Sequence, residues 1–103
     1  MAQYDVYPNP TPGTGFPYIV DLQSAQLDRL PTRLVMPLQR LPRAPQHLPR
    51  RLVQSVRVQG EDFYLAAHQC AAVPSKLLRQ PVAALASQAG RLLDALDAVI
   101  SGV

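Results

Sequence analysis

The chain has 103 residues, of which 48% are hydrophobic and 17% charged, and a formal net charge of +3 at pH 7. This length predicts a single domain over residues 1–103, because two lobes with a cleft between them need a longer chain. No apolar run approaches a membrane span and the N-terminus does not read as a secretory signal, so we expect a cytoplasmic protein. One cysteine, Cys70, and two histidines do not make a metal site, and we expect neither a metal nor a cofactor.

The sequence predicts short strands that are separated by turns rich in proline and glycine. The predicted strands cover residues 3–7, 16–23, 33–38, 51–58 and 63–68. The second is expected to be half-buried, with Tyr18 and Val20 on its apolar face. The last two are expected to form a hairpin in which Gly60 adopts a positive φ. Residues 39–49 contain three prolines and no regular period, which predicts a long exposed loop.

One long helix is predicted after Pro81, with a short helical turn at Pro74 and Ser75 before it. Its apolar residues step by four and three, which is typical of a packed helical seam. The seam consists of Leu85, Ala89, Leu92, Leu96, Val99 and Val103. Because Ile100 widens the apolar arc, we expect part of the helix to face a second subunit in a homodimer. Gly90 predicts either a close backbone approach or simply a less stable helix.

Positive charge is concentrated in one part of the chain. Between residues 29 and 60 there are seven arginines and no acidic residue. They are Arg29, Arg33, Arg40, Arg43, Arg50, Arg51 and Arg57. Such a block attracts an acidic partner or a nucleic-acid backbone, although a solvated basic face without a dedicated partner is an equal alternative. Proline and leucine, rather than aromatic residues, separate the arginines, which disfavours a surface for base stacking.

Side chains that could carry catalysis are sparse, so we do not expect an enzyme. Glu61 and Asp62 fall in the predicted hairpin turn and are better interpreted as solvated carboxylates than as an acid–base pair with His68. Tyr4 and Tyr7 are three residues apart and would point to opposite faces of a strand. We expect Tyr4 to reach the surface, and packing of both rings inside is the alternative.

Four stretches stand in an ordered series along almost the whole chain. They are "IVDLQS" (19–24), "RLVMPL" (33–38), "AAVP" (71–74) and a terminal helix that runs into "SGV". In this order and spacing the chain resembles the CcdB family, the toxin half of bacterial toxin–antitoxin modules. The resemblance implies a mainly β fold with one C-terminal α-helix, in which an SH3-like barrel of antiparallel strands forms a symmetric dimer, as in the CcdB, Kid and MazF toxins.

The resemblance also implies a target and a neutralising partner. Family members bind the DNA gyrase A subunit and trap the gyrase–DNA cleavage complex, a function that serves plasmid maintenance. The implied gyrase contacts are Gln3, Tyr4, Tyr7, Ser24, Gln26, Asp97, Ile100, Ser101, Gly102 and Val103. A CcdA-like antitoxin with an acidic, disordered tail would suit the arginine block, and the residues assigned to it are Arg40, Arg43, Arg50 and Arg51. Operator DNA would be bound, and transcription regulated, only together with that antitoxin.

Ser101 departs from the family, which has a tryptophan there that stacks on an arginine of gyrase A. Gln26, in place of an aliphatic residue, and Asp97, in place of an amide, are lesser departures. An anchoring tryptophan contributes about 2 kcal/mol or more, and losing roughly 3 kcal/mol weakens binding by about two orders of magnitude. The chain is therefore a weaker gyrase poison, a homologue with another target or a co-repressor role, or an inactivated copy. A ribonuclease toxin of the MazF or Kid type is the enzymatic alternative.

Overall fold

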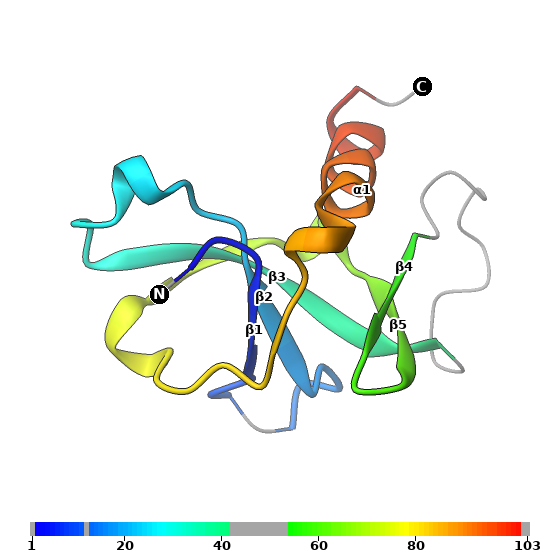
Figure 1. The fold of residues 1–103 in the computed structure, drawn as a ribbon, viewed down its shortest axis with the longest axis horizontal. Helices are drawn as coiled ribbons and strands as arrows, with labels where there is room; N and C mark the ends of the chain where they lie inside the picture. The colour runs from blue at the N-terminus through cyan, green and yellow to red at the C-terminus, as the bar shows by residue number, and fades with distance from the viewer. Residues whose placement is uncertain (1, 12, 42–53, 102–103) are drawn as a thin grey trace.

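The computed structural model describes residues 2–11, 13–41 and 54–101. These residues form a mostly antiparallel sheet that curves into a nearly closed barrel, followed by one C-terminal helix (Figure 1). The strands are β1 (Asp5–Pro8), β2 (Tyr18–Asp21), β3 (Thr32–Arg40), β4 (Ser55–Val58), β5 (Glu61–Leu65), β6 (Ala71–Pro74) and β7 (Ala83–Ala84). The helical segments are η1 (Ala25–Leu27), η4 (Ala67–Gln69), η5 (Ser75–Leu77), η6 (Ala86–Gln88) and α1 (Ala89–Ser101). The predicted barrel with one terminal helix is confirmed.

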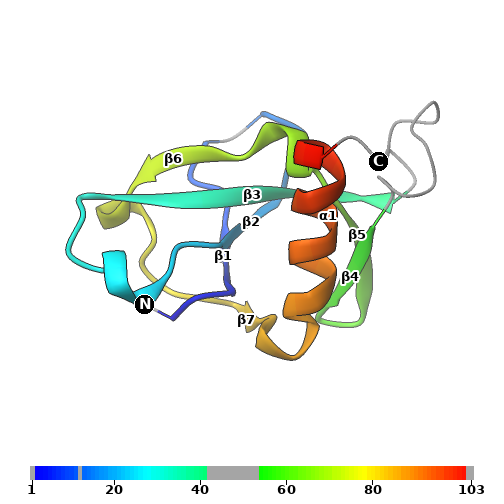
Figure 2. The same ribbon diagram turned by 90° about the horizontal axis from the view of Figure 1, so that it is seen from above.

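The long strand β3 organises the sheet, whose strand order is β4-β5-β3-β2-β1-β7. On one side β3 pairs with β2, and on the other it pairs first with β6, over Thr32–Val35, and then with β5, over Leu38–Arg40. Figure 2 shows β3 running the length of the molecule, with α1 crossing it nearer to its β5 end. The loop before β3 and the hairpin after it are thus placed at opposite ends of one strand.

Both faces of the sheet are buried, each in its own apolar cluster. The larger cluster is centred on Met36, Leu38 and Phe63 and is covered by Leu92 and Ala95 of α1. The smaller cluster comprises Tyr7, Ile19, Val35 and Leu78. The prediction that the second strand is half-buried was wrong, because Leu78, from the segment after η5, covers the face that the sequence pattern left to solvent.

The predicted helix after Pro81 begins only at Ala89. Residues 82–85 bond to β1 and Tyr4 instead, since Val82 N donates to Val6 O at 2.8 Å and Leu85 N donates to Tyr4 O at 2.8 Å, and residues 86–88 form η6. Leu85 is fully buried at the end of this short strand, so tertiary burial and pairing override local helix propensity. Of the two alternatives for Gly90, the close backbone approach was wrong, because a Cβ there would meet no described atom within 4 Å.

Several strand boundaries differ from the predicted ones. The first strand begins at Asp5, because Tyr4 has φ 73° and leaves the extended conformation. The third runs on to Arg40, two residues into the predicted loop, and β6 was not predicted at all. Residues 42–49 of that loop, and 51–53 of the predicted fourth strand, lie outside the described residues. The hairpin is confirmed, with Gln59 at φ 50° and Gly60 at φ 80°.

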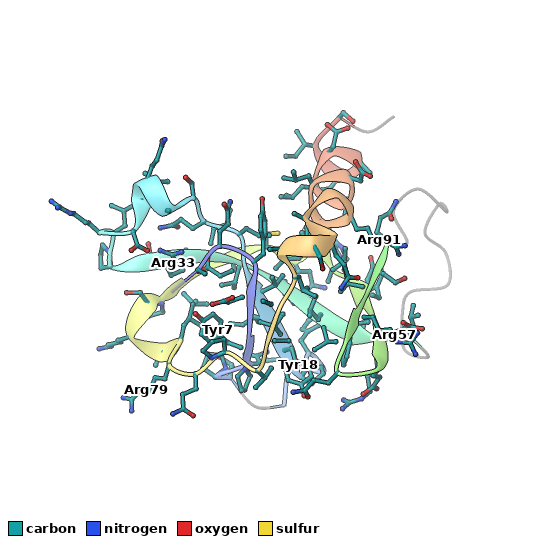
Figure 3. All side chains as sticks on the ribbon, in the orientation of Figure 1. Tyr7, Tyr18, Arg33, Arg57, Arg79 and Arg91 are labelled. Carbon is teal, nitrogen blue, oxygen red and sulfur yellow. The ribbon has the colours of Figure 1, made fainter. Side chains whose placement is uncertain are left out.

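Side chains close the barrel along the outer edge of β4. The Gln88 amide imitates a neighbouring strand, since its Oε1 accepts from Arg57 N at 3.1 Å and its Nε2 donates to Arg57 O at 3.2 Å. Beside it, Arg91 Nη1 donates to Ser55 O at 3.0 Å. Figure 3 shows Arg57 and Arg91 together on this side of the molecule. These bonds satisfy edge groups that would otherwise be open to pairing with another chain.

Gln88→Ala is expected to lower the free energy of unfolding by about 1–3 kcal/mol, because two hydrogen bonds of about 0.5–1.5 kcal/mol each are lost. Urea unfolding followed by circular dichroism measures the change. Gln80→Ala is the matched control, since Gln80 is exposed and its side chain makes no hydrogen bond within the described part of the chain. Equal losses in the two variants would show that Gln88 does not hold the edge.

Candidate partner-binding surface

The described residues among the implied gyrase contacts lie at three places. Gln3 and Tyr4 precede β1 and Tyr7 lies within it, Ser24 and Gln26 lie at the start of η1, and the remainder lie in the last turns of α1. These last residues are Asp97, Ile100 and Ser101. In Figure 1, η1 and the end of α1 rise from the same side of the sheet, separate from each other. Gly102 and Val103 lie outside the described residues.

The segment before β1 is fastened to the end of β2. Gln3 Nε2 donates to Leu22 O at 3.0 Å, and Tyr4 N donates to Asp21 O at 2.6 Å. The Tyr4 ring is partly buried against the larger apolar cluster and keeps some exposed surface. Its left-handed backbone conformation is unfavourable for a non-glycine residue, and the bonds on both sides hold it there.

Tyr7 is buried, with 1% of its surface exposed. The two rings pack against different clusters, as predicted, but Tyr4 lies before β1 and is itself partly buried, so it reaches the surface only in part. Direct contact between Tyr7 and a partner is not supported by this position, because its side chain packs in the smaller cluster. Burial, and then the charges of Asp5 and Asp21, raise the pKa of Tyr7. Burial likewise raises the pKa of Tyr64.

Alkaline pH is expected to destabilise the fold through these two buried rings. A tyrosine in the unfolded chain ionises near pH 10, whereas the raised pKa keeps the folded ring protonated, so unfolding releases protons. The stabilisation is complete below about pH 10 and is lost as the pH rises through the folded-state pKa values. Urea unfolding at about pH 8 and about pH 10.5 should show this loss, and it should be smaller in Tyr64→Phe. A free energy of unfolding that stays constant over this range would contradict the expectation.

A buried polar network, which we call the arginine clamp, fastens the η1 loop (residues 24–31) to the sheet. Its members are Asp21, Gln23, Asp28 and Arg33. Arg33 is 1% exposed and donates to Asp21 Oδ2 from Nη2 at 2.6 Å and from Nε at 3.0 Å, while Asp21 is 0% exposed. From the loop, Asp28 Oδ1 accepts from Arg33 Nη1 at 2.6 Å. Figure 3 shows Arg33 at the η1 end of β3.

The charge of Arg33 is stabilised in its buried position. Burial by itself would lower the pKa of Arg33, but the hydrogen bonds and charges of Asp21 and Asp28 outweigh it, so the pKa is raised above its usual value. The two hydrogen bonds to Asp21 form in surroundings that exclude water, where charge-assisted bonds are strong. The guanidinium is therefore a fixed cationic centre to which loop residues can bind.

Gln23 supplies the second attachment of the loop. Its Oε1 accepts from Leu34 N at 3.0 Å, and its Nε2 donates to Leu27 O and Thr32 O, both at 3.0 Å. The Gln23 amide thus joins the η1 turn to the residues at the start of β3. A half-buried second strand with Tyr18 and Val20 on its apolar face would leave Asp21 and Gln23 on the opposite, polar face, so the clamp was not predicted. The signal that could have indicated it is an aspartate at the end of one apolar strand and an arginine at the start of the next.

Apolar residues are exposed along α1, and two of them, Val99 and Ile100, lie in its last turn. Leu92 and Ala95 face the core, whereas Leu93, Val99 and Ile100 are exposed, Ile100 by 78%. The predicted seam is therefore buried only in part. Ser101 is exposed, and its Oγ donates to Asp97 O at 2.7 Å.

The arginine block is less positive than its sequence predicts. Arg33 is buried and paired with two aspartates, so its inclusion in a basic surface was wrong. Arg40 is exposed at the end of β3, where its Nε donates to Glu61 Oε2 at 2.9 Å and its guanidinium lies 5.9 Å from the Phe63 ring centroid. Glu61 and Asp62 are exposed in the hairpin, as predicted. The other arginines assigned to the antitoxin, Arg43, Arg50 and Arg51, lie outside the described residues.

The described residues hold no cluster of metal ligands, and their one cysteine is a weak nucleophile. Within residues 2–11, 13–41 and 54–101, no three or more His, Cys, Asp or Glu side chains gather as metal ligands. Cys70 is half-buried, and burial raises the pKa of its thiol, which makes it a weak nucleophile at neutral pH. In the same part of the chain, no helix has the length and apolar character needed to cross a membrane.

Comparison with known protein families identifies the family to which the chain is similar. The family model described as CcdB protein matches residues 3–102, which span every strand and helix described above. No curated protein matches the chain. The matched range includes the segment before β1, the η1 loop and the end of α1.

Proposed function

This chain belongs to the CcdB family, and so is a toxin of the toxin–antitoxin type; from that premise we propose that it acts by binding DNA gyrase, without chemistry of its own. The proposed target is the gyrase A subunit, and the proposed effect is a gyrase–DNA complex that is trapped with its DNA cleaved. The observation that carries the proposal is the presence of η1 and the exposed end of α1 on one side of the barrel, with the implied contact residues on both. The clamped loop and the helix offer a firm binding surface, which suits an inhibitor that acts by contact alone.

We propose that the active form is a symmetric homodimer. The outer face of α1 leaves Leu93, Val99 and Ile100 exposed in the single chain, and a two-fold contact would cover such a face with its own copy. Sedimentation at micromolar concentration should give a dimer. A monomer under those conditions would count against the symmetric arrangement.

A CcdA-like antitoxin is the proposed neutralising partner in the cytoplasm, and operator DNA is bound only in its company. Arg40 supports this proposal, since it is exposed and already binds a carboxylate, that of Glu61. An acidic tail would replace Glu61 at this guanidinium and gain charge-assisted hydrogen bonds. Arg43, Arg50 and Arg51 are proposed to extend the same contact.

Calorimetric titration of the purified chain into purified gyrase A subunit tests the proposed target. We expect saturable binding that Ile100→Ala weakens, because its exposed side chain is the most prominent apolar group on the proposed surface. Leu77→Ala is the matched control, since Leu77 is an exposed apolar residue on η5, outside that surface, and its loss should leave binding unchanged.

Incubation with RNA tests the ribonuclease alternative. The chain is expected to leave RNA intact under conditions in which a MazF-type toxin cleaves it. Absence of binding to gyrase A together with RNA cleavage by the purified chain would overturn the proposed target and favour the ribonuclease alternative.

A further inference from the structure

We infer that Asp28, acting through Arg33, positions the η1 loop for its partner, so that the arginine clamp is the device that gives this part of the binding surface its shape. The inference rests on the proposed function, in which Ser24 and Gln26 of this loop contact gyrase A. It adds a positioning role for residues that lie behind the contact surface.

The loop has little else to hold it. No residue of η1 is buried, so the apolar core does not fix its position. Its internal backbone bonds are those of short turns: Leu27 N donates to Ser24 O at 3.0 Å, Asp28 N to Ala25 O at 3.2 Å, and Leu30 N to Leu27 O at 3.2 Å. Its last residue, Pro31, is bonded to η5, since its O accepts from Ser75 N at 2.8 Å and from Ser75 Oγ at 3.1 Å. Turns of this kind are weak by themselves. The polar attachments to the sheet therefore decide where the loop lies.

Asp28 and Gln23 attach different parts of the loop. Gln23 Nε2 binds Leu27 O, close to the middle of the loop, and also binds Thr32 O at its end. Asp28 lies after the η1 turn, and its Oδ1 accepts from Nη1 of the buried Arg33 at 2.6 Å. This bond is the charge-assisted attachment of the loop. Without it, residues 28–30 keep only their local turn bonds between two attached points, Leu27 O, which binds Gln23, and Pro31 O, which binds Ser75.

The role of Asp28 can be separated from the stability of the fold. Asp21 remains as the buried counter-ion of Arg33 when Asp28 is removed. The Asp28 side chain is 55% exposed, so water can take its place on Arg33 Nη1. Removing Asp28 should therefore loosen the loop without unfolding the barrel, whereas removing Arg33 should do both.

A loop that is fixed before binding loses less conformational freedom when it binds. Ser24 and Gln26 are exposed, and the Ser24 Oγ accepts from Gln26 N at 3.2 Å, which sets their relative positions. The clamp sets the position of this pair relative to the barrel. Its loss should weaken the complex even though Asp28 itself need not touch the partner.

The test compares Asp28→Ala, the conservative Asp28→Glu and the control Asp62→Ala in the full chain. Asp62 is an exposed aspartate of the hairpin and belongs to no part of the clamp. Amide hydrogen exchange of the free chain, followed by NMR, reports on the loop, and titration into gyrase A reports on binding. For Asp28→Ala we expect at least tenfold faster exchange at the Leu27 and Leu30 amides, unchanged exchange at Leu34, and about tenfold weaker binding. Asp28→Glu should restore part of both, and Asp62→Ala should alter neither.

Three results would overturn the inference: unchanged exchange in the loop of Asp28→Ala, faster exchange in the loop with unchanged affinity, or faster exchange throughout the barrel. The last would make Asp28 a general stabilising residue rather than a positioning one. Failure of the unsubstituted chain to bind gyrase A would instead contradict the proposed function, and the exchange measurement on the free chain would still decide whether Asp28 orders the loop.

Discussion

Arg33→Ala is expected to lower the free energy of unfolding by about 3–5 kcal/mol, since it leaves a buried carboxylate without its counter-charge. Asp21 has 0% of its side chain exposed and receives two hydrogen bonds from Arg33. The same substitution also releases Asp28 and with it the η1 loop. A domain of this size has a total stability of about 5–15 kcal/mol, so the variant should unfold at a much lower urea concentration.

Arg40→Ala is the matched comparison, because it also removes an arginine from an ion pair. Arg40 and Glu61 are each 49% exposed, and a pair in such a position contributes about 0–1 kcal/mol. A small loss for Arg40→Ala beside a large one for Arg33→Ala is therefore expected. Losses of similar size, or a change below about 1 kcal/mol for Arg33→Ala, would show that the buried pair does not stabilise the fold.

Ser101→Trp is expected to tighten binding to gyrase A by about 100-fold. The resemblance to the CcdB family assigns a tryptophan to this position, and such a residue stacked on an arginine of the partner contributes about 2 kcal/mol or more. Ser101 is exposed at the end of α1, and its hydroxyl binds only Asp97 O among the described residues. The indole ring would therefore displace no core side chain and would remain available to the partner. Titration into gyrase A measures the gain.

Ser87→Trp is the control that distinguishes specific binding at position 101 from non-specific association caused by any exposed indole. Ser87 is exposed in η6, at the opposite end of the helical segment, and a tryptophan there should leave gyrase A binding unchanged. Equal gains from both substitutions would indicate non-specific association. No gain from Ser101→Trp would show that the end of α1 does not face the arginine of gyrase A in the manner the family resemblance implies.

The elements that sequence reasoning located correctly are those whose signal is local. The hairpin around Gly60 follows from the turn residues, and the apolar runs of β2 and β3 follow from their composition. By contrast, "AAVP" of β6 and "VAAL" around β7 are short and rich in alanine, and their local pattern fits a helix or a loop equally well. Pairing with β3 and β1, which are distant in sequence, makes them strands.

The candidate surface was likewise predicted only in part. The family resemblance supplied the exposed residues on η1 and α1, but the arginine clamp behind η1 was not predicted. Asp21 looks like a solvent-facing residue until the segment around Leu78 covers the second face of the sheet. Arg33 looks like part of a basic surface until Asp21, 12 residues away, neutralises it. The burial of Asp21 and its pairing with Arg33 both depend on closure of the barrel, which cannot be predicted from a local sequence pattern.

Gyrase poisoning is tested most directly by incubating the purified chain with DNA gyrase and supercoiled DNA, denaturing the protein, and measuring linear DNA on a gel. We predict that linear DNA accumulates as the concentration of the chain rises, and that Ser101→Trp reaches the same level at a lower concentration. Supercoiled and relaxed DNA alone, at concentrations of the chain that saturate the gyrase A subunit, would contradict the proposed function.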